Sequence, residues 1–200
     1  AGTARAIDEL PALPGAPREL AALAAALGDD GARLLIGDDA TEAQLRAMPV
    51  PQGAVLAFAT HGLLSGELDG LDEPALLLTP AGGDDGLLKP SEIGGMTLPA
   101  RLVILSACNT AGAAGTDRPQ LSGLVEGFFL AGAERVMASH WPVRDDIARR
   151  LSVGMVKGMR AGEDPPAALR AAIAAVRTGR DGEARADHPA LWAPFELFSR

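Results

Sequence analysis

Two reactive side chains each follow a short apolar run in this sequence. Residues 54–59 lead through Thr60 into His61, and residues 102–107 lead into Cys108. Runs of this length predict strands that are buried on both faces of a sheet. In open parallel sheets, ligands sit outside the carboxyl ends of the strands, so neighbouring strands would place the histidine beside the thiol. A Cys–His pair indicates nucleophilic catalysis, with the imidazole favouring the thiolate.

Each residue also has an ordinary explanation. Cys108 could be a buried apolar thiol at a strand end, because free cysteine is among the most buried residue types. A single histidine at a strand end commonly satisfies a backbone carbonyl group. Because both residues follow apolar strands, we favour catalysis over two separate structural explanations. No second cysteine is present, which weighs against thiol–disulfide chemistry and leaves a thiol-dependent acyl transferase as a weaker alternative.

The glycine after His61 suits an oxyanion hole. Gly62 allows the backbone to approach a ligand closely, and the amides of Gly62 and Cys108 could bind the oxyanion of a tetrahedral intermediate. The alternative for Gly62 is a simple turn glycine.

Charge and composition exclude several classes of protein. The net charge is −8, the pI is about 4.9, and no basic cluster is present, so nucleic acid is not expected as a direct partner. A single cysteine can form neither an internal disulfide nor a cysteine-rich zinc site, which favours a reducing, cytoplasmic compartment. Nucleotide-binding and metalloprotease motifs are absent, so we expect no cofactor and no metal. No apolar run predicts a membrane span or a signal peptide.

Strands alternate with helices along the chain, which predicts an α/β fold with a mostly parallel sheet between helix layers. The 200 residues suit one domain over residues 1–200, and the start at Ala1 suggests a fragment of a longer chain or a processed protein. A long loop is expected at 109–120, where such loops are usually functional or disordered. The expected helices are 17–27, a helix capped by Asp39 or Thr41 and ending near 47, 121–131, 145–160 and 164–178; the expected strands are 33–36, 54–59, 75–78, 102–107, 135–139 and 195–198, with a further loop at 79–90.

The two strand ends carry the motifs Ala59-Thr60-His61-Gly62 and Leu105-Ser106-Ala107-Cys108-Asn109-Thr110. These resemble the catalytic motifs of CHAT domains, which are caspase-like, separase-related cysteine peptidase domains. His61 precedes Cys108 by 47 residues, near the spacing of about 50 in caspases, although the caspase Gln-Ala-Cys signature is not matched. Further segments of the chain resemble the family and occur in the family's order: 37–41, 86–93, 123–132, 138–143 and 188–195. His140 is a departure, because the family often has an apolar residue there.

The resemblance implies a three-layer caspase–hemoglobinase-like sandwich that hydrolyses peptide bonds. His61 would be the general base and acid, Cys108 the nucleophile, and Gly62 part of the oxyanion hole. It further implies a protein or peptide substrate, and tetratricopeptide-type repeats elsewhere in the full chain.

Asp145 and Asp146 lie just past the third strand, in the region that helps build the substrate pocket in separase-like relatives. A carboxylate there would pair with an Arg or Lys before the scissile bond. An equal alternative is that one of them caps the following helix. The alternative to a peptidase is an interaction or signalling module of the same fold, inactive until a partner orders the loop after Cys108.

Overall fold

A four-stranded sheet in the order β1-β5-β6-β7 lies at the centre of the protein. The computed structural model describes residues 7, 10–28, 31–107, 121–141 and 143–200. The strands β1, β5 and β6 are parallel, and β7 pairs antiparallel with β6 at one edge. Their bounds are Ala54–Phe58, Ala100–Leu105, Arg135–Ser139 and Phe195–Ser199. The prediction of a mostly parallel α/β sheet is therefore confirmed.

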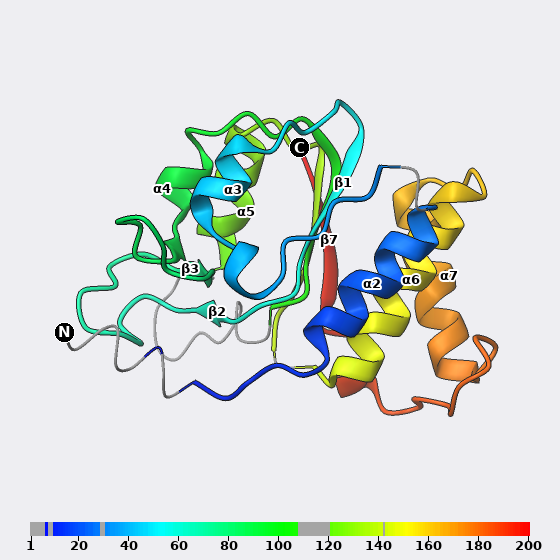
Figure 1. Ribbon diagram of the computed structural model, residues 1–200. Coiled ribbons are helices and arrows are strands. Elements are labelled where there is room, and N and C mark those ends of the chain that lie inside the picture. Colours follow the sequence, from blue (N-terminus) through cyan, green and yellow to red (C-terminus); the bar gives the residue numbers. More distant parts are fainter. Residues whose placement is uncertain (1–6, 8–9, 29–30, 108–120, 142) are drawn as a thin grey trace.

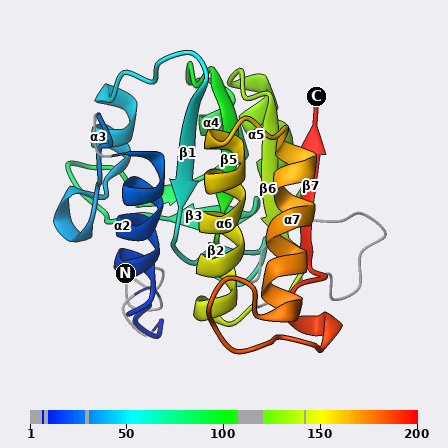
Figure 2. The ribbon, with the colours of Figure 1, turned by 90° about the vertical axis from the view of Figure 1, so that its right-hand side faces the viewer.

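Helices cover both faces of this sheet (Figure 1). On one face lie α2, α6 and α7, which stand side by side in front of the strands in Figure 2. On the other face lie α3, α4 and α5. In chain order, the bounds of these helices are α2 (Ala16–Leu27), α3 (Glu42–Ala47), α4 (Pro90–Ile93), α5 (Leu121–Leu130), α6 (Asp145–Arg160) and α7 (Pro165–Thr178). In the part of the chain described, no helix is both long and apolar enough to cross a membrane.

A second, small antiparallel sheet lies on the α4–α5 side. Its strands are β2 (Gly62–Leu63), β3 (Ala75–Leu77) and β4 (Leu87–Leu88). The expected strand at 75–78 is present, but it belongs to this sheet and not to the central one. The expected loop at 79–90 contains β4. Sequence reasoning missed this strand, because two leucines are too short a run to show strand periodicity.

The expected strand at 33–36 is wrong. These residues have no regular secondary structure, and a short 3₁₀ helix follows at Gly37–Asp39. Leu34 is 43% exposed and Ile36 is 41% exposed, so this apolar run is not buried between layers. Apolar sequence alone thus did not distinguish a buried strand from an exposed extended segment.

Local capping explains where several helices begin and end. Thr41, one of the two expected caps of α3, accepts a hydrogen bond from the amide of Gln44 at 3.2 Å. Asp164 caps α7 by accepting from the amide of Ala167 at 2.7 Å, one residue before the helix begins. Gly28 ends α2 with φ of 81°, a conformation that favours glycine. A short 3₁₀ helix at Pro189–Leu191 precedes β7.

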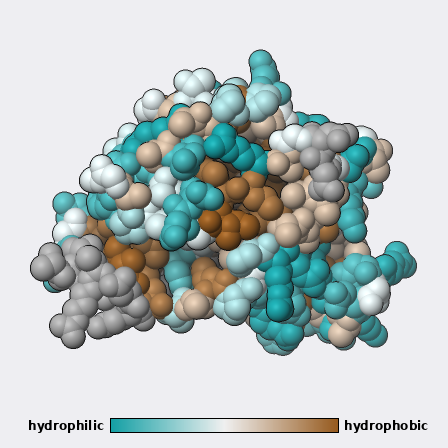
Figure 3. Space-filling model, viewed as in Figure 1, coloured by the Kyte–Doolittle hydropathy of each residue, from teal (hydrophilic) through white to brown (hydrophobic). Residues whose placement is uncertain are grey.

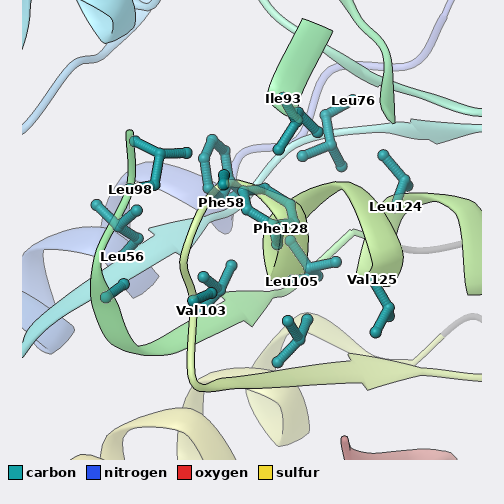
Figure 4. Close-up of a cluster of buried hydrophobic side chains, with 14 of the residues drawn as sticks. Leu56, Phe58, Leu76, Ile93, Leu98, Val103, Leu105, Leu124, Val125 and Phe128 are labelled. Atoms are coloured by element: carbon teal, nitrogen blue, oxygen red, sulfur yellow. The ribbon is translucent and has the colours of Figure 1, made fainter. Parts of the chain in front are cut away.

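The side chains of β5 alternate between two apolar clusters. Val103 and Leu105 pack toward α5, whereas Leu102 and Ile104 pack toward α2 and α6. On the α5 side, the ring of Phe128 lies 5.3 Å from that of Phe58, with the planes tilted by 49° (Figure 4). This alternation follows from the period of two in a strand, and it explains why the run is apolar throughout.

We predict that Phe128→Ala lowers the free energy of unfolding by about 3–5 kcal/mol, because the ring is fully buried and its loss leaves a cavity. Urea unfolding measures this change. Leu130→Ala on the same helix is the control, because Leu130 is 70% exposed and its loss should change stability by less than about 0.5 kcal/mol. Equal losses in the two variants would contradict the assignment of Phe128 to the core.

Candidate active site

The carboxyl ends of β1 and β5 lie side by side. Phe58 pairs with Leu105 in a parallel ladder, and the amide of Ser106 donates to the carbonyl of Phe58 at 2.9 Å. In sequence, His61 and Cys108 each follow this pair by three positions. The two strands are therefore neighbours, which is the condition under which the histidine would lie beside the thiol. Cys108 itself and the expected loop at 109–120 lie outside the described residues.

The turn that carries His61 is fixed to β3. The hydroxyl of Thr60 donates to the carbonyl of Leu77, and the amide of Leu77 donates to the carbonyl of His61 at 2.9 Å. Both backbone groups of Leu77 thus hold the two residues before Gly62. This clamp gives a physical reason for the threonine in the motif, because its hydroxyl satisfies a backbone acceptor at the strand end.

A backbone carbonyl orients the imidazole of His61. The Nε2 atom lies 2.8 Å from the carbonyl oxygen of Pro11, in the segment that precedes α2. A carbonyl oxygen only accepts hydrogen bonds, so Nε2 carries the proton and Nδ1 of the neutral ring carries the lone pair. The half-buried ring is thereby held in one tautomer, with Nδ1 as its basic atom. Pro11 was missed by sequence reasoning, because a backbone carbonyl has no sequence signature.

The amide of Gly62 points away from β3. Gly62 lies opposite Leu76, and the flanking bond joins the amide of Leu77 to the carbonyl of His61. In an antiparallel ladder this pattern marks a pair whose own amides face outward. Gly62 is buried, and β2 is an edge strand of the small sheet. The geometry is compatible with the expected oxyanion role of this amide.

His61 lines one end of a surface cleft of about 470 Å³. The cleft lies between the segment 10–13, α2, residues 33–36 and β1, and most of its lining is apolar. The apolar surface at the centre of Figure 3, between α3 and α2, belongs to it. The histidine is therefore placed at a surface cavity and not within either apolar core.

The two aspartates after β6 differ in their surroundings. The carboxylate of Asp146 receives two hydrogen bonds from Arg144, both at 2.9 Å. Asp145 is exposed and lies against Gly15, where an added Cβ would meet its Oδ2 at 2.3 Å. The N-cap residue of α6 is Arg144, so neither aspartate caps the helix as the alternative proposed. Both lie in its first turn, where negative charge is favoured.

A second histidine lies near the same edge of the sheet. The Nε2 atom of His140, directly after β6, lies 2.5 Å from Oε2 of Glu196 in β7. Its ring also lies 6.3 Å from that of Phe198. Sequence reasoning noted His140 as a departure from the family, and it missed Glu196, which lies 56 residues further along the chain. The Nδ1 atom of His188 accepts a hydrogen bond from the amide of Ala190, which is a structural role.

A buried carboxyl group lies beneath the end of β5. Glu19 on α2 is 4% exposed. Each of its two carboxyl oxygens accepts a hydrogen bond of 2.8 Å from a serine hydroxyl, one from Ser106 and one from Ser152 on α6. Burial away from water raises the pKa of Glu19, and the negative charge of Asp145 adds to this effect. The two hydroxyl bonds and the positive charge of Arg149 act in the opposite direction without cancelling it.

We predict that Glu19→Gln gains stability relative to the unchanged protein as the pH rises. The raised pKa means that the folded state retains this proton longer than the unfolded state does. The protein therefore loses stability from about pH 4.5 upward, until the group is ionised in both states. Glutamine does not titrate, and each tenfold difference in proton affinity is worth about 1.4 kcal/mol.

Urea unfolding between pH 4 and pH 8 measures the difference between the two proteins. The exposed Glu126→Gln is the control for adding an amide elsewhere. A difference that stays constant with pH for Glu19→Gln would contradict the assignment.

Among the described residues, no group of three or more His, Cys, Asp or Glu could hold a metal ion.

Comparison with known proteins identifies the family. No curated protein matches the chain. The family model for the CHAT domain matches residues 5–200, which covers the paired strands, the His61 turn and the position of Cys108. The chain therefore belongs to the CHAT-domain family, whose fold is related to that of caspase-like proteases.

Proposed function

We propose that this domain is a cysteine peptidase with Cys108 as nucleophile and His61 as general base and acid. The observation that carries the proposal is the bond from Nε2 of His61 to Pro11, which leaves Nδ1 as the basic atom at the end of β1. The adjacent strand β5 leads in sequence to the cysteine. A nucleophile, a base and a group that orients the base are the three parts that such a site requires.

The chemistry would proceed in two steps. His61 takes the thiol proton of Cys108, and the thiolate sulfur attacks the substrate carbonyl carbon. When the tetrahedral intermediate collapses, the C–N bond breaks, and His61 gives the proton to the leaving amine. His61 then deprotonates a water molecule, which attacks the thioester and releases the carboxylic acid. The thiol proton is restored from His61, so no cofactor is consumed.

The amides of Gly62 and Cys108 would stabilise the oxyanion in both steps. The outward direction of the Gly62 amide, on the edge strand β2, supports this role. Fixed backbone donors need no reorganisation when charge develops, and one such donor is worth about 3–4 kcal/mol.

Specificity for a basic residue before the scissile bond would come from the start of α6. Asp145 is the stronger candidate, because Asp146 is already bonded to Arg144. A protein or peptide substrate with Arg or Lys at this position would bind the carboxylate of Asp145 by a charge-assisted hydrogen bond.

We predict that an acyloxymethyl ketone peptide probe labels Cys108 and that His61→Ala slows labelling by about 10²–10⁴-fold, because the thiolate loses its base. Intact-mass spectrometry after timed incubation measures the adduct. Cys108→Ala should give no adduct.

His140→Leu is the matched control, since His140 follows the neighbouring strand and bonds to Glu196 instead of Pro11. Its labelling rate should match that of the unchanged protein. If His140→Leu stops labelling and His61→Ala does not, the base is wrongly assigned. If no probe labels the unchanged protein, the domain acts as an interaction module until a partner activates it.

We predict that Asp145→Asn lowers kcat/KM for substrates with Arg before the scissile bond about tenfold, a loss of about 1.4 kcal/mol, while substrates with Leu are unaffected. Steady-state hydrolysis of two fluorogenic peptides that differ only at this residue measures the ratio. Asp146→Asn is the control and should change the ratio less. A ratio unchanged in both variants would remove α6 from the specificity pocket.

A further inference from the structure

Glu19 joins three elements that are distant in sequence. Its carboxyl group lies between α2, the end of β5 and α6, and its two hydroxyl partners are 87 and 133 residues away. In Figure 2, α2 and α6 run side by side over the sheet, with β5 behind them. One side chain therefore links all three elements by hydrogen bonds.

The carboxyl group is costly at this position. Within the part of the chain that the structure describes, no cation is bonded to either of its oxygens, and Arg149 acts on it only through its field. Burying a carboxylate costs several kcal/mol unless good hydrogen bonds compensate, and apolar residues of similar size often serve stability equally well. Glu42, a second buried glutamate among the described residues, is compensated differently, because Arg46 bonds to it at 2.7 Å. Stability alone thus gives little reason for a glutamate at position 19.

The partner Ser106 is the residue that connects Glu19 to the site. Its amide bonds to the carbonyl of Phe58 at the end of β1, and its hydroxyl bonds to Glu19. The first bond ties Ser106 to the strand that leads to His61, and the second ties it to α2. Cys108 follows two positions later in the sequence. Ser106 is therefore held from both sides just before the proposed nucleophile.

We propose that Glu19 is a positioning residue, which holds Ser106 and thereby the direction in which the backbone leaves β5 toward Cys108. This inference rests on the proposed function for its catalytic consequence. Misplacement of a reacting group by about 1 Å can cost roughly 10²-fold in rate. The hydroxyls of Ser106 and Ser152 hold the carboxyl group from two sides, which restricts its movement.

Two substitutions separate position from charge. Glutamine can keep the geometry: its carbonyl oxygen accepts from Ser106, and its amide donates to Ser152. The hydroxyl of Ser152 can then turn to the carbonyl of Arg149, which lies 3.2 Å away. Leucine has a similar size but can accept no hydrogen bond, so it releases Ser106 while filling the space. Both substitutions remove the ionisable carboxyl group, whose pKa is raised by Asp145 and lowered by Arg149.

The test measures the alkylation rate of Cys108 by iodoacetamide at pH 6 and pH 9, together with kcat and KM. For Glu19→Leu we expect a pH 6 rate at least about fivefold lower, because a misplaced thiol loses the pairing with His61 that ionises it. At pH 9 the rates should converge, since an ordinary thiol is then largely ionised. We expect kcat to fall roughly tenfold with KM nearly unchanged, while the melting temperature does not fall. Glu19→Gln should retain both rates.

The controls distinguish this proposal from a merely structural role and from failure of the proposed function. Glu42→Leu removes a buried glutamate on the other face, and it should lower the melting temperature without changing the alkylation ratio between pH 6 and pH 9. Equal alkylation of Glu19→Leu and the unchanged protein, whether fast or slow, overturns the proposal. So does faster alkylation of both Glu19 variants at pH 6, which would show an effect of charge alone. If the unchanged protein hydrolyses no peptide but the ratio still shifts, the proposed function fails and the positioning role stands.

Discussion

The parallel pairing of β1 with β5 is the constraint on which the rest of this structure depends. Phe58 lies opposite Leu105, and every residue of β5 after Arg101 is buried by one helix layer or the other. A shift of one residue would exchange the faces of every side chain in the strand, which fixes the register strongly. In the sequence, His61 and Cys108 each follow this pair by three positions. The ladder that orders the core therefore also pairs the two strands that lead to the proposed dyad.

Much of the fold was predictable, because a strand that is buried on both faces requires a continuous apolar run in the sequence. The strands β1 and β5 follow from such runs, and α7 begins after Asp164, whose side chain bonds to the amide of Ala167. The failures have the same physical origin. Residues 33–36 carry an apolar run without burial, and β4 has burial without enough length to show a pattern. Short elements are determined by tertiary contacts that local sequence does not contain.

Sequence reasoning reached the candidate site only where the type of a residue points to its role. His61 and Gly62 follow a recognisable strand end, and the clamp of Thr60 on Leu77 explains why this turn is well defined. Pro11 contributes through a carbonyl that any residue possesses, so its identity gives no signal. Glu19 and Ser106 meet only because α2 packs beneath the end of β5, 87 residues away in sequence. The orienting partners of a site are thus the part that needs a structure.

The carboxyl groups near this edge differ in what balances their charge, and that difference bears on substrate recognition. Glu196 is bonded to His140, and Asp146 is bonded to Arg144. Glu19 is buried and bonded to two hydroxyls. A cationic substrate would have to displace an existing partner from the first two, and it could not reach the third without opening the contact between α2 and α6. Asp145 is exposed at the start of α6, which is why it is the carboxylate we propose for selecting a basic residue.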